Sequence, residues 1–344
     1  MSGPIFVVGG SRCGTELVRQ TLNRHPAIYL AVETHWFDDM RPRLRHPANP
    51  APSERDAILD YLLSVDRHGY GLRATAISKD AKEALDRRWQ ATGAHADAAF
   101  EAFCRAKMEA EGACRWGEKT PRHLFRVPEI LGVWPDAKIV ICLRDPRGAV
   151  ASYKDWTNNW FDLSALSTGE RSGVEAEERR VRASYDLTIA SLMWRSAARA
   201  GIRAREAYSP ERVRLQRFED LVARPEPQLR EIAEWLDVDF DEAMLAASLT
   251  NSSYASEGSA PGFQTGPLER YRTRLNPQEI AYIEALTRRE RKLLYYADSD
   301  AALSPNFALR QAVKLPPRIV RAFLANRRRM GSLTAFLQRH LRGF

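Results

Sequence analysis

Residues 4–18 read PIFVVGGSRCGTELV, and this stretch decides the fold. Its first half is a run of β-branched and aromatic residues, which is typical of a strand buried in a parallel sheet. Two glycines end the run, and apolar residues then recur with helical spacing at Leu17, Val18 and Leu22 until Pro26 closes the helix. A strand, a glycine-bearing turn and a helix form the opening half of an α/β unit. We therefore predict an α/β domain that contains this strand in its sheet.

Two more runs of strand length follow, KIVICL at Lys138–Leu143 and residues 213–218. A helix is expected to begin near Pro146, because proline is favoured in the first turn of a helix. Residues 53–115 are rich in Ala, Arg and acidic side chains at helical spacing, and we interpret them as a helical insertion. The pattern also predicts helices at residues 175–206, 228–236 and 276–298, and a long loop at residues 251–267.

The charge of the chain is concentrated at its C-terminal end. The 344 residues carry 52 basic and 44 acidic side chains, a formal net charge of +8. Nine basic residues and no acidic one lie in residues 304–344, so removing those nine charges leaves about −1 for residues 1–303. We predict one domain at 1–303 with a basic tail at 304–344. Because the domain has no general basic character, we expect no nucleic-acid partner.

The tail itself has the pattern of a basic amphipathic helix. Such a helix suits a peripheral contact with a membrane surface. It could also pack its apolar stripe against the domain, and we favour this second arrangement. The apolar positions that alternate with arginines are Ile319, Val320, Phe323, Leu324, Leu333, Phe336, Leu337 and Leu341.

Targeting signals and metal-binding patterns are missing from the sequence. The N-terminus has no basic region, and its apolar run is too short for a signal peptide. No run of 18 apolar residues predicts a spanning helix. The four cysteines form no C-x-x-C pair and no zinc-ligand spacing. We expect a cytoplasmic protein that needs no metal.

The turn after the first strand, residues 9–15, is suited to an anion. Successive backbone N–H groups and a helix N-terminus together hold phosphate-like groups. The spacing of Gly9 and Gly14 matches the two glycines of a Walker A loop, although Thr15 stands where that loop has its lysine and Glu16 follows. The turn therefore favours an anion site that differs from that of ordinary ATPases. A P-loop kinase acting on a small molecule, or glycines needed only for tight packing, are the alternatives.

Two further strings complete a pattern with this turn: GEKTP at residues 117–121 and RDPRGAVAS at residues 144–152. In this order and at these distances, the three strings resemble the sulfotransferases that use 3′-phosphoadenosine 5′-phosphosulfate. The nearest branch is that of the tyrosylprotein and bacterial sulfotransferases. The resemblance covers about residues 4–300 and implies a P-loop-like, three-layer fold whose central parallel sheet has about five strands.

The same resemblance implies the reaction, transfer of a sulfuryl group from this donor to an acceptor hydroxyl. We expect a small metabolite, a glycan or a phenol as acceptor, with a tyrosine-directed protein sulfotransferase as the alternative. The family's 5′-phosphosulfate loop, usually P-R-S-G-T-T, would here depart at three of six positions, and the third string would be its 3′-phosphate motif. The implied donor-binding residues are Gly10, Ser11, Arg12, Cys13, Gly14, Thr15, Glu16, Arg144, Ser152 and, from a later loop, Arg270 or Arg272.

The third string needs particular residue types for a phosphate. Arg144 can grip an anion with its planar guanidinium, and Ser152 can donate a hydroxyl hydrogen bond. A surface ion pair between Arg144 and Asp145 is the alternative. In the second string, Lys119 resembles the family lysine that stabilises charge on the bridging oxygen, an electrostatic contribution to catalysis. Arg12 would act beside it.

The acceptor hydroxyl must lose a proton, so a general base is required. Glu33, followed by Thr34, resembles the catalytic glutamate of the tyrosylprotein branch, and a pKa raised by burial would suit this role. His123 is the second candidate, because Pro121 occupies the position where cytosolic small-molecule sulfotransferases have their histidine. His35 and Trp36 are expected to line the acceptor side, although Trp36 could equally belong to the core.

Overall fold

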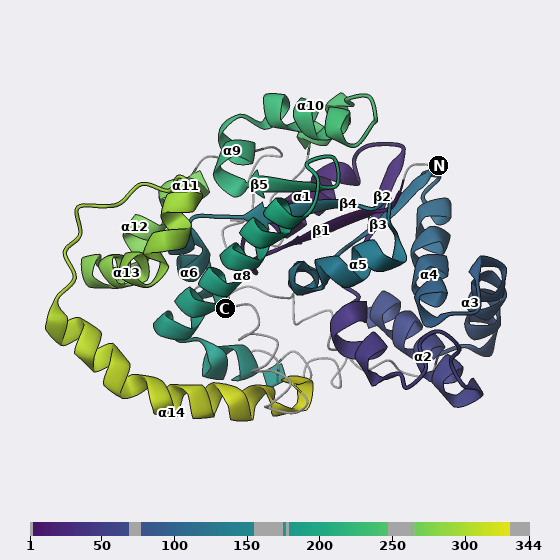
Figure 1. The fold of residues 1–344 in the computed structure, drawn as a ribbon, viewed down its shortest axis with the longest axis horizontal. Helices are drawn as coiled ribbons and strands as arrows, with labels where there is room; N and C mark the ends of the chain where they lie inside the picture. The colour runs from purple at the N-terminus through teal and green to yellow at the C-terminus, as the bar shows by residue number, and fades with distance from the viewer. Residues whose placement is uncertain are drawn as a thin grey trace.

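The computed structural model describes residues 3–68, 77–154, 175–176, 179–246, 263 and 266–330 (Figure 1). A five-stranded sheet lies at the centre, in the order β2-β3-β1-β4-β5, and every pairing is parallel. This confirms the predicted α/β fold with a central parallel sheet of five strands. The strands are β1 (Ile5–Gly9), β2 (Ile28–Ala31), β3 (Arg115–Lys119), β4 (Lys138–Leu143) and β5 (Val213–Arg217).

Helices cover both faces of the sheet and make a three-layer arrangement. Alternate side chains of β1 point to opposite faces, as strand geometry requires. One set packs with α1 (Thr15–Leu22) and α10 (Pro225–Trp235). The other set packs on the opposite face with α4 (Ala96–Ala110), where Phe6 stacks on Phe100 at 6.3 Å between ring centroids. Trp36, Trp116 and Trp134 extend this aromatic core.

The sequence pattern missed two strands, β2 and β3. β2 has only four residues, and β3 reads RWGEK, with three charged residues and a glycine. All five residues of β3 are nevertheless buried, because its neighbours β1 and β2 and the covering helices leave no solvent-facing side. Burial by tertiary neighbours therefore makes a strand out of a segment that has little strand propensity.

Three helices occupy most of the segment that we interpreted as a helical insertion. They are α2 (Pro52–His68), α3 (Lys79–Thr92) and α4, which stand together at one end of the sheet in Figure 1, and residues 69–76 lie outside the described part. α4 contacts both β2 and β3.

The single long helix predicted at residues 175–206 is wrong. The chain is extended at Asp186, and α8 (Leu187–Ala207) begins after it. The Asp186 carboxylate accepts hydrogen bonds from the backbone N–H groups of Thr188 and Ile189, at 2.9 and 3.0 Å. An N-cap of this kind starts a new helix rather than continuing an old one.

The other predicted helices are present with small shifts in their bounds. α13 begins with a capping box between Asn276 and Glu279. The predicted loop at 251–267 lies outside the described residues apart from Phe263 and the first two residues of α11. The remaining elements are α5 (Val127–Val133), α6 (Pro146–Lys154), α9 (Phe218–Ala223), α11 (Gly266–Glu269), α12 (Tyr271–Arg274), α13 (Pro277–Leu293), α14 (Pro305–Met330) and short turns of other helix types at Trp36–Met40, Arg41–Arg43, Pro121–Arg126 and Glu242–Ala246.

Candidate active site

The sheet order places a topological switch point, here called the crevice, at the carboxyl ends of β1 and β4. These strands are neighbours, but from β1 the chain continues to β2 on one side, and from β4 it continues to β5 on the other. Parallel α/β sheets bind ligands where the connections diverge in this way. The glycine turn leaves β1 at this point, and Arg144 follows β4. The two strings that the sequence singled out therefore meet at one place.

The geometry of the turn depends on Gly14. This residue is the N-cap of α1 and has a φ of 87°, in the left-handed region that favours glycine. A Cβ there would also lie 2.5 Å from the ring of Phe218. The first N–H groups of α1 have no partner within the helix, and together with the helix dipole they favour an anion beyond the N-terminus.

Arg12 and Ser152 are 140 residues apart in the chain and in direct contact in the structure. The Arg12 Nε donates to the Ser152 Oγ at 3.0 Å, and Ser152 is buried on α6. Arg12 itself has a positive φ of 64°, which turns its side chain out of the loop toward α6. This contact joins the predicted 5′-phosphosulfate turn to the predicted 3′-phosphate motif.

The Cys13 side chain is buried beneath the turn and packs in the core. Burial raises the pKa of its thiol to about 12, so the side chain stays neutral. Its backbone N–H donates to Gly10 O at 3.2 Å, and the Gly10 N–H donates to Cys142 O at 3.2 Å. The N–H groups of Cys13 and Gly10 thus close the turn and attach it to β4, and donor contacts of these two residues stay a prediction.

Arg144 is buried, so a solvated surface ion pair does not describe it. Its guanidinium lies over the ring of Phe218, 4.4 Å from the centroid. Gly148, one helical turn into α6, leaves room for it, because a Cβ there would lie 2.8 Å from the Arg144 Nε. The neighbouring Asp145 accepts a hydrogen bond from Arg147 Nε at 2.9 Å. Arg144 is thus a buried cation at the crevice, as an anion site requires.

Lys119, the last residue of β3, lies between two carboxylates. Its Nζ is 2.5 Å from Glu33 Oε1 and 3.0 Å from Glu16 Oε2. The Lys119 side chain is 6% exposed, whereas that of Glu33 is 35% exposed, so the glutamate forms the solvent-facing part of the pair. Glu16 also accepts from Arg19 Nη2 at 2.6 Å and from Gln20 Nε2 at 3.1 Å. The Glu16 carboxylate therefore binds cations and does not offer a donor contact of its own.

These contacts set the protonation states. Burial by itself would raise the pKa of the Glu33 carboxyl, but the Lys119 ammonium and the His35 ring outweigh it, and that pKa lies well below its usual range. Burial acts to lower the pKa of Lys119, but the carboxylates of Glu33 and Glu16 outweigh it, so that this pKa is raised. Glu33 is thus a charged, paired carboxylate, whereas the expectation was a base whose pKa burial raises.

Glu118, which the sequence analysis missed, is fully buried at the end of β3. Its Oε1 accepts from the N–H and the hydroxyl of Thr34 at 2.9 and 2.8 Å, and also from the hydroxyl of Thr120. Its Oε2 lies 3.1 Å from His123 Nδ1. The network ties the segment after β2, which carries Glu33, to the strand that carries Lys119. An acidic residue inside a buried strand would have indicated such a network, but the sequence pattern did not predict β3 as a strand.

His123 belongs to this buried network. The N–H of Phe37 donates to its Nε2 at 3.2 Å, which leaves Nδ1 as the atom that donates to Glu118. With both ring nitrogens engaged and the side chain fully buried, His123 has no free nitrogen toward an acceptor. The geometry gives it a positioning role, and Glu33 is the better candidate for a base.

The two predicted acceptor-side residues separate. His35 Nε2 lies 3.2 Å from Glu33 Oε2, so the ring adjoins the predicted base. Trp36 is fully buried, donates from Nε1 to Asp97 at 2.9 Å and stacks on Phe100 at 5.8 Å. Trp36 therefore belongs to the core, where an acceptor cannot reach it.

The later arginines lie on short helices next to α6. Both α11 and α12 contact α6, the helix that carries Ser152. Arg272 is exposed and forms an ion pair with Glu269. Arg270 is half-buried at the junction of the two helices. A contact from either residue to a 3′-phosphate remains a prediction.

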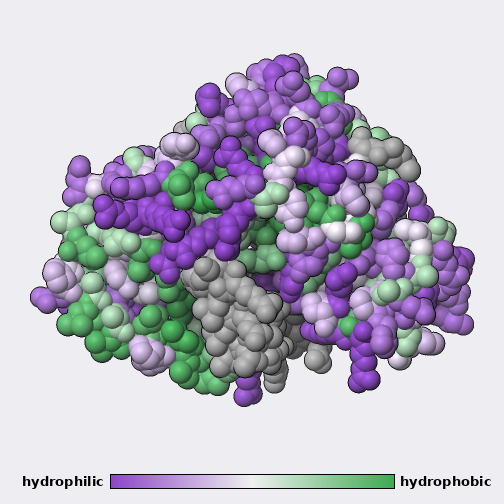
Figure 2. Space-filling view, in the orientation of Figure 1, coloured by the Kyte–Doolittle hydropathy of each residue, from purple (hydrophilic) through white to green (hydrophobic). Residues whose placement is uncertain are grey.

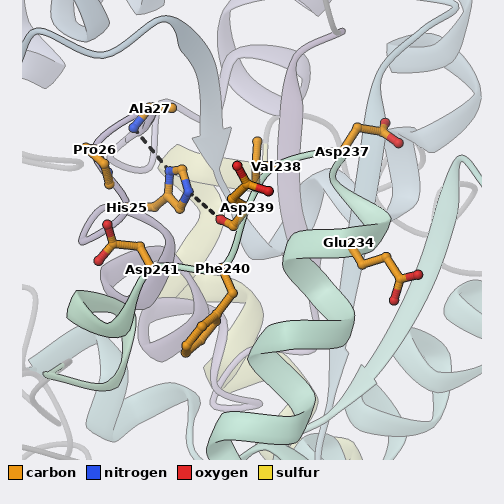
Figure 3. Close-up of a pocket in the computed structure, with 9 residues that line it drawn as sticks. All are labelled: His25, Pro26, Ala27, Glu234, Asp237, Val238, Asp239, Phe240 and Asp241. Atoms are coloured by element: carbon orange, nitrogen blue, oxygen red, sulfur yellow. Dashed lines mark hydrogen bonds between the residues drawn. The ribbon is translucent and has the colours of Figure 1, made fainter.

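A hollow lies near the amino ends of β2, β3 and β4, the opposite end of these strands from the crevice, between the residues before β2 and those after α10 (Figure 3). It has a volume of about 560 Å³. The ring of His25, which lines the hollow, is held at both nitrogens. Nε2 lies 2.9 Å from Asp239 O, and Nδ1 accepts a hydrogen bond from the Ala27 N–H at 3.1 Å. Glu234, Asp237 and Asp241 also line it. Such an acidic hollow repels a polyanion, so it does not compete with the crevice for a donor nucleotide.

No set of three His, Cys, Asp or Glu side chains in the described ranges is arranged to hold a metal ion. In the same ranges no helix is both long and apolar enough to cross a membrane. The expectation that the protein needs no metal stays a prediction.

A parallel sheet with a glycine turn at its switch point is typical of the P-loop-like class of α/β folds. The sequence profile of the Sulfotransferase family matches residues 4–242, and the chain belongs to this family.

Curated relatives are distant and longer than this chain. The protein-tyrosine sulfotransferase of Drosophila melanogaster is 24% identical over 70% of this chain and 39% of its own length. The nodulation protein NoeE of Sinorhizobium fredii is 26% identical over 68% of this chain and 50% of its own length. The chain thus spans half or less of the length of these two relatives.

Solved structures agree on the fold. The sulfotransferase domain of the Synechococcus PCC 7002 olefin synthase has a TM-score of 0.51 at 19% identity, covering 87% of this chain and 98% of that one. The sulfotransferase domain from the curacin biosynthetic pathway has a TM-score of 0.53 at 17% identity, with 87% and 99% covered. Both are similar to this chain in the arrangement of its core.

We predict that Glu118→Gln destabilises the protein by about 2–4 kcal/mol at neutral pH, because the donors around it lose a charged acceptor. The His123 ring and the hydroxyl hydrogen bonds outweigh burial and lower the pKa of Glu118. Because the pKa of Glu118 is lower in the folded protein than in the unfolded chain, where it is near 4.5, the ionised carboxylate stabilises the fold above about pH 4.5. This stabilisation is lost as the pH falls through the pKa of the folded state. The difference between wild type and variant should therefore shrink below about pH 4.5.

Urea unfolding measured between pH 3.5 and 8 would check this, with Glu226→Gln as the control. Glu226 forms an exposed ion pair with Arg230, so its loss should change the free energy of unfolding by less than about 1 kcal/mol. Equal effects of the two substitutions would contradict the buried network.

Proposed function

We propose that the protein transfers a sulfuryl group from 3′-phosphoadenosine 5′-phosphosulfate to the hydroxyl of a small metabolite, a glycan or a phenol. The observation that supports this most is the contact between Arg12 and Ser152, which unites the two anion-binding strings at the crevice where Arg144 lies buried. The donor carries anionic groups at both ends, so it needs two anion sites a nucleotide apart. The turn with Arg12 supplies N–H groups and a cation for one of these sites, and buried Arg144 supplies a cation for the other.

The chain's own residues divide the work. The N-terminus of α1, the Thr15 hydroxyl and Arg12 would hold the 5′-phosphosulfate, and Arg144 with Ser152 would hold the 3′-phosphate. The donor supplies the sulfuryl group, whose bond to the bridging oxygen breaks while the acceptor oxygen forms its bond to sulfur. Lys119 would stabilise the negative charge left on the bridging oxygen. Glu33 would take the proton that the acceptor hydroxyl loses.

The ion pair between Lys119 and Glu33 links donor binding to the base. Without a donor, the Lys119 ammonium faces Glu33 and lowers its pKa. A sulfonate near Lys119 would draw the ammonium away from Glu33. The carboxylate would then keep its burial and lose its main counter-charge, so its pKa would rise and its proton affinity with it. Glu33 would thus become an effective base only once a donor is bound.

The first test is thermal unfolding with 3′-phosphoadenosine 5′-phosphate, the expected product nucleotide. At a concentration near 100 times its dissociation constant, the melting temperature should rise by roughly 5 °C. Arg144→Gln should abolish the shift, because the variant lacks the buried guanidinium, whereas Arg230→Gln on the exposed face of α10 should keep it. A shift with ATP and Mg²⁺ but none with the bisphosphate would favour the kinase alternative and overturn the proposal.

We predict that Glu33→Gln lowers kcat by roughly 10²–10⁴-fold and leaves the affinity for the bisphosphate within about threefold. The amide keeps the shape of the side chain but cannot accept a proton. Turnover with labelled donor, measured with a panel of hydroxyl acceptors, gives the first value, and calorimetry gives the second. If Glu33→Gln retains full turnover while His123→Asn abolishes it at unchanged stability, the assignment of the base is wrong.

Glu16 offers a separate prediction about donor affinity. Its carboxylate competes with an anionic donor for Lys119, and the family's pattern has a threonine there. Glu16→Thr and Glu16→Gln should therefore both bind the bisphosphate or the donor about 5–10 times more tightly than the wild type. Titration calorimetry would measure this, with Glu129→Gln on α5 as a control that should leave affinity unchanged. Weaker binding in both variants would mean that Glu16 holds Lys119 in place for the donor.

A further inference from the structure

α14 contacts the body of the protein through a mixture of polar and half-buried apolar side chains. It packs beside α8 and the segment before it, along one edge of the molecule in Figure 1. Arg318 Nη1 donates to Asp186 Oδ2 at 2.5 Å, and Asn326 Nδ2 donates to Ser184 Oγ at 2.6 Å. Hydrogen bonds and an ion pair hold this helix in place, together with Phe307 near its start, whose ring lies 5.8 Å from that of Tyr282.

The opposite side of α14 is apolar and exposed. The exposed fractions of Leu309, Val313, Val320 and Leu324 are 64%, 68%, 57% and 56%. Their spacing of four, seven and four residues places them on one face of a helix. Together with Ile319 they account for five of the nine large apolar side chains that are exposed in the described part of the chain. Figure 2 shows apolar side chains gathered over the region that α14 occupies in Figure 1.

The packing that we favoured from the sequence does not hold for Ile319, Val320 and Leu324, which face solvent, whereas Phe323 is half-buried. The other predicted stripe positions, Leu333, Phe336, Leu337 and Leu341, lie outside the described residues. Surface helices of folded domains normally bury their apolar face. A helix that is anchored to the body and still leaves five large apolar side chains exposed is arranged to meet something else.

Charge indicates what that partner is. Three basic side chains of α14 are exposed: Arg310, Lys314 and Arg321. Each comes one residue after an apolar residue of the stripe, so they lie about one third of a turn around the helix from it. No acidic residue occurs after residue 303. An apolar stripe with a basic flank fits a bilayer that carries anionic lipid headgroups. A two-fold contact with a second copy would bring the same basic flank opposite itself.

We propose that α14 lies in the plane of an anionic membrane surface, with its apolar stripe in the boundary between headgroups and acyl chains. Arg310 and Lys314 then reach the lipid phosphates. The side of α14 that carries Arg318 and Asn326 stays bound to the segment that contains Ser184 and Asp186, so the body of the protein is held at the membrane surface. This proposal rests on α14 alone and does not depend on the reaction that the crevice catalyses.

Co-sedimentation of the full chain with vesicles tests it. We expect binding to phosphatidylcholine vesicles that contain about 30% phosphatidylglycerol, little binding to pure phosphatidylcholine, and weakening as NaCl rises from about 0.1 to about 0.5 M. Val313→Ser combined with Val320→Ser should weaken binding about tenfold or more. Arg310→Gln combined with Lys314→Gln should weaken it roughly 25-fold, about fivefold for each charge.

Matched controls use exposed residues elsewhere. Met193→Ser combined with Leu293→Ser removes two exposed apolar side chains outside α14, and Arg288→Gln combined with Arg289→Gln removes two exposed charges from α13. Both should bind vesicles as the wild type does. Three results would overturn the proposal: no binding to anionic vesicles, full binding by the valine variant, or a dimer in sedimentation velocity that this variant abolishes while vesicles fail to bind.

Discussion

The site depends on one buried carboxylate, Glu118. A charge without water is costly unless hydrogen bonds satisfy it, and this one is satisfied by Thr34, Thr120 and His123. The requirement fixes where the chain after β2 must run, because Thr34 has to reach the end of β3. Glu33 and Lys119, the neighbours of Thr34 and Glu118 in sequence, are thereby brought within 2.5 Å of each other. A structural need thus sets the distance between the proposed base and the proposed electrostatic catalyst.

The crevice balances its charges without being broadly basic. Each proposed anion-binding cation has a partner of its own: Lys119 has two carboxylates, Arg12 has the Ser152 hydroxyl, and Arg144 has the Phe218 ring. A domain whose net charge is close to zero can therefore hold a polyanion. The partners keep the cations in place before a ligand arrives, which lowers the entropy cost of binding. The cost is competition, since a carboxylate must release Lys119 when an anion binds.

Sequence patterns revealed the turn with Arg12 and α6 with Arg144 before it, because both lie on strand–helix units with strong local signals. Lys119 was identified only through the resemblance carried by its GEKTP string. Sequence patterns failed where local and tertiary preferences conflict. β3 has a charged, glycine-containing sequence and is a strand because of its neighbours, so Glu118 escaped notice with it. The protonation state of Glu33 also depends on tertiary contacts, because Lys119 is 86 residues away. Trp36 shows that closeness in sequence does not imply a place in the site. It follows Glu33 by three residues, yet its ring packs on Phe100 in the core.

The positive charges of the chain act in two different environments. In the crevice, Lys119 and Arg144 are buried, so dissolved salt screens their interactions weakly, and recognition there depends on short distances and fixed geometry. On α14, Arg310 and Lys314 are exposed, so salt screens them strongly and they act through a field that reaches about one Debye length, roughly 10 Å at 0.1 M salt. Net charge would have assigned both groups to one nucleic-acid-binding surface. Burial separates them: buried cations suit a single anionic ligand, as we propose for the crevice, whereas exposed cations suit an extended anionic surface, as we propose for α14.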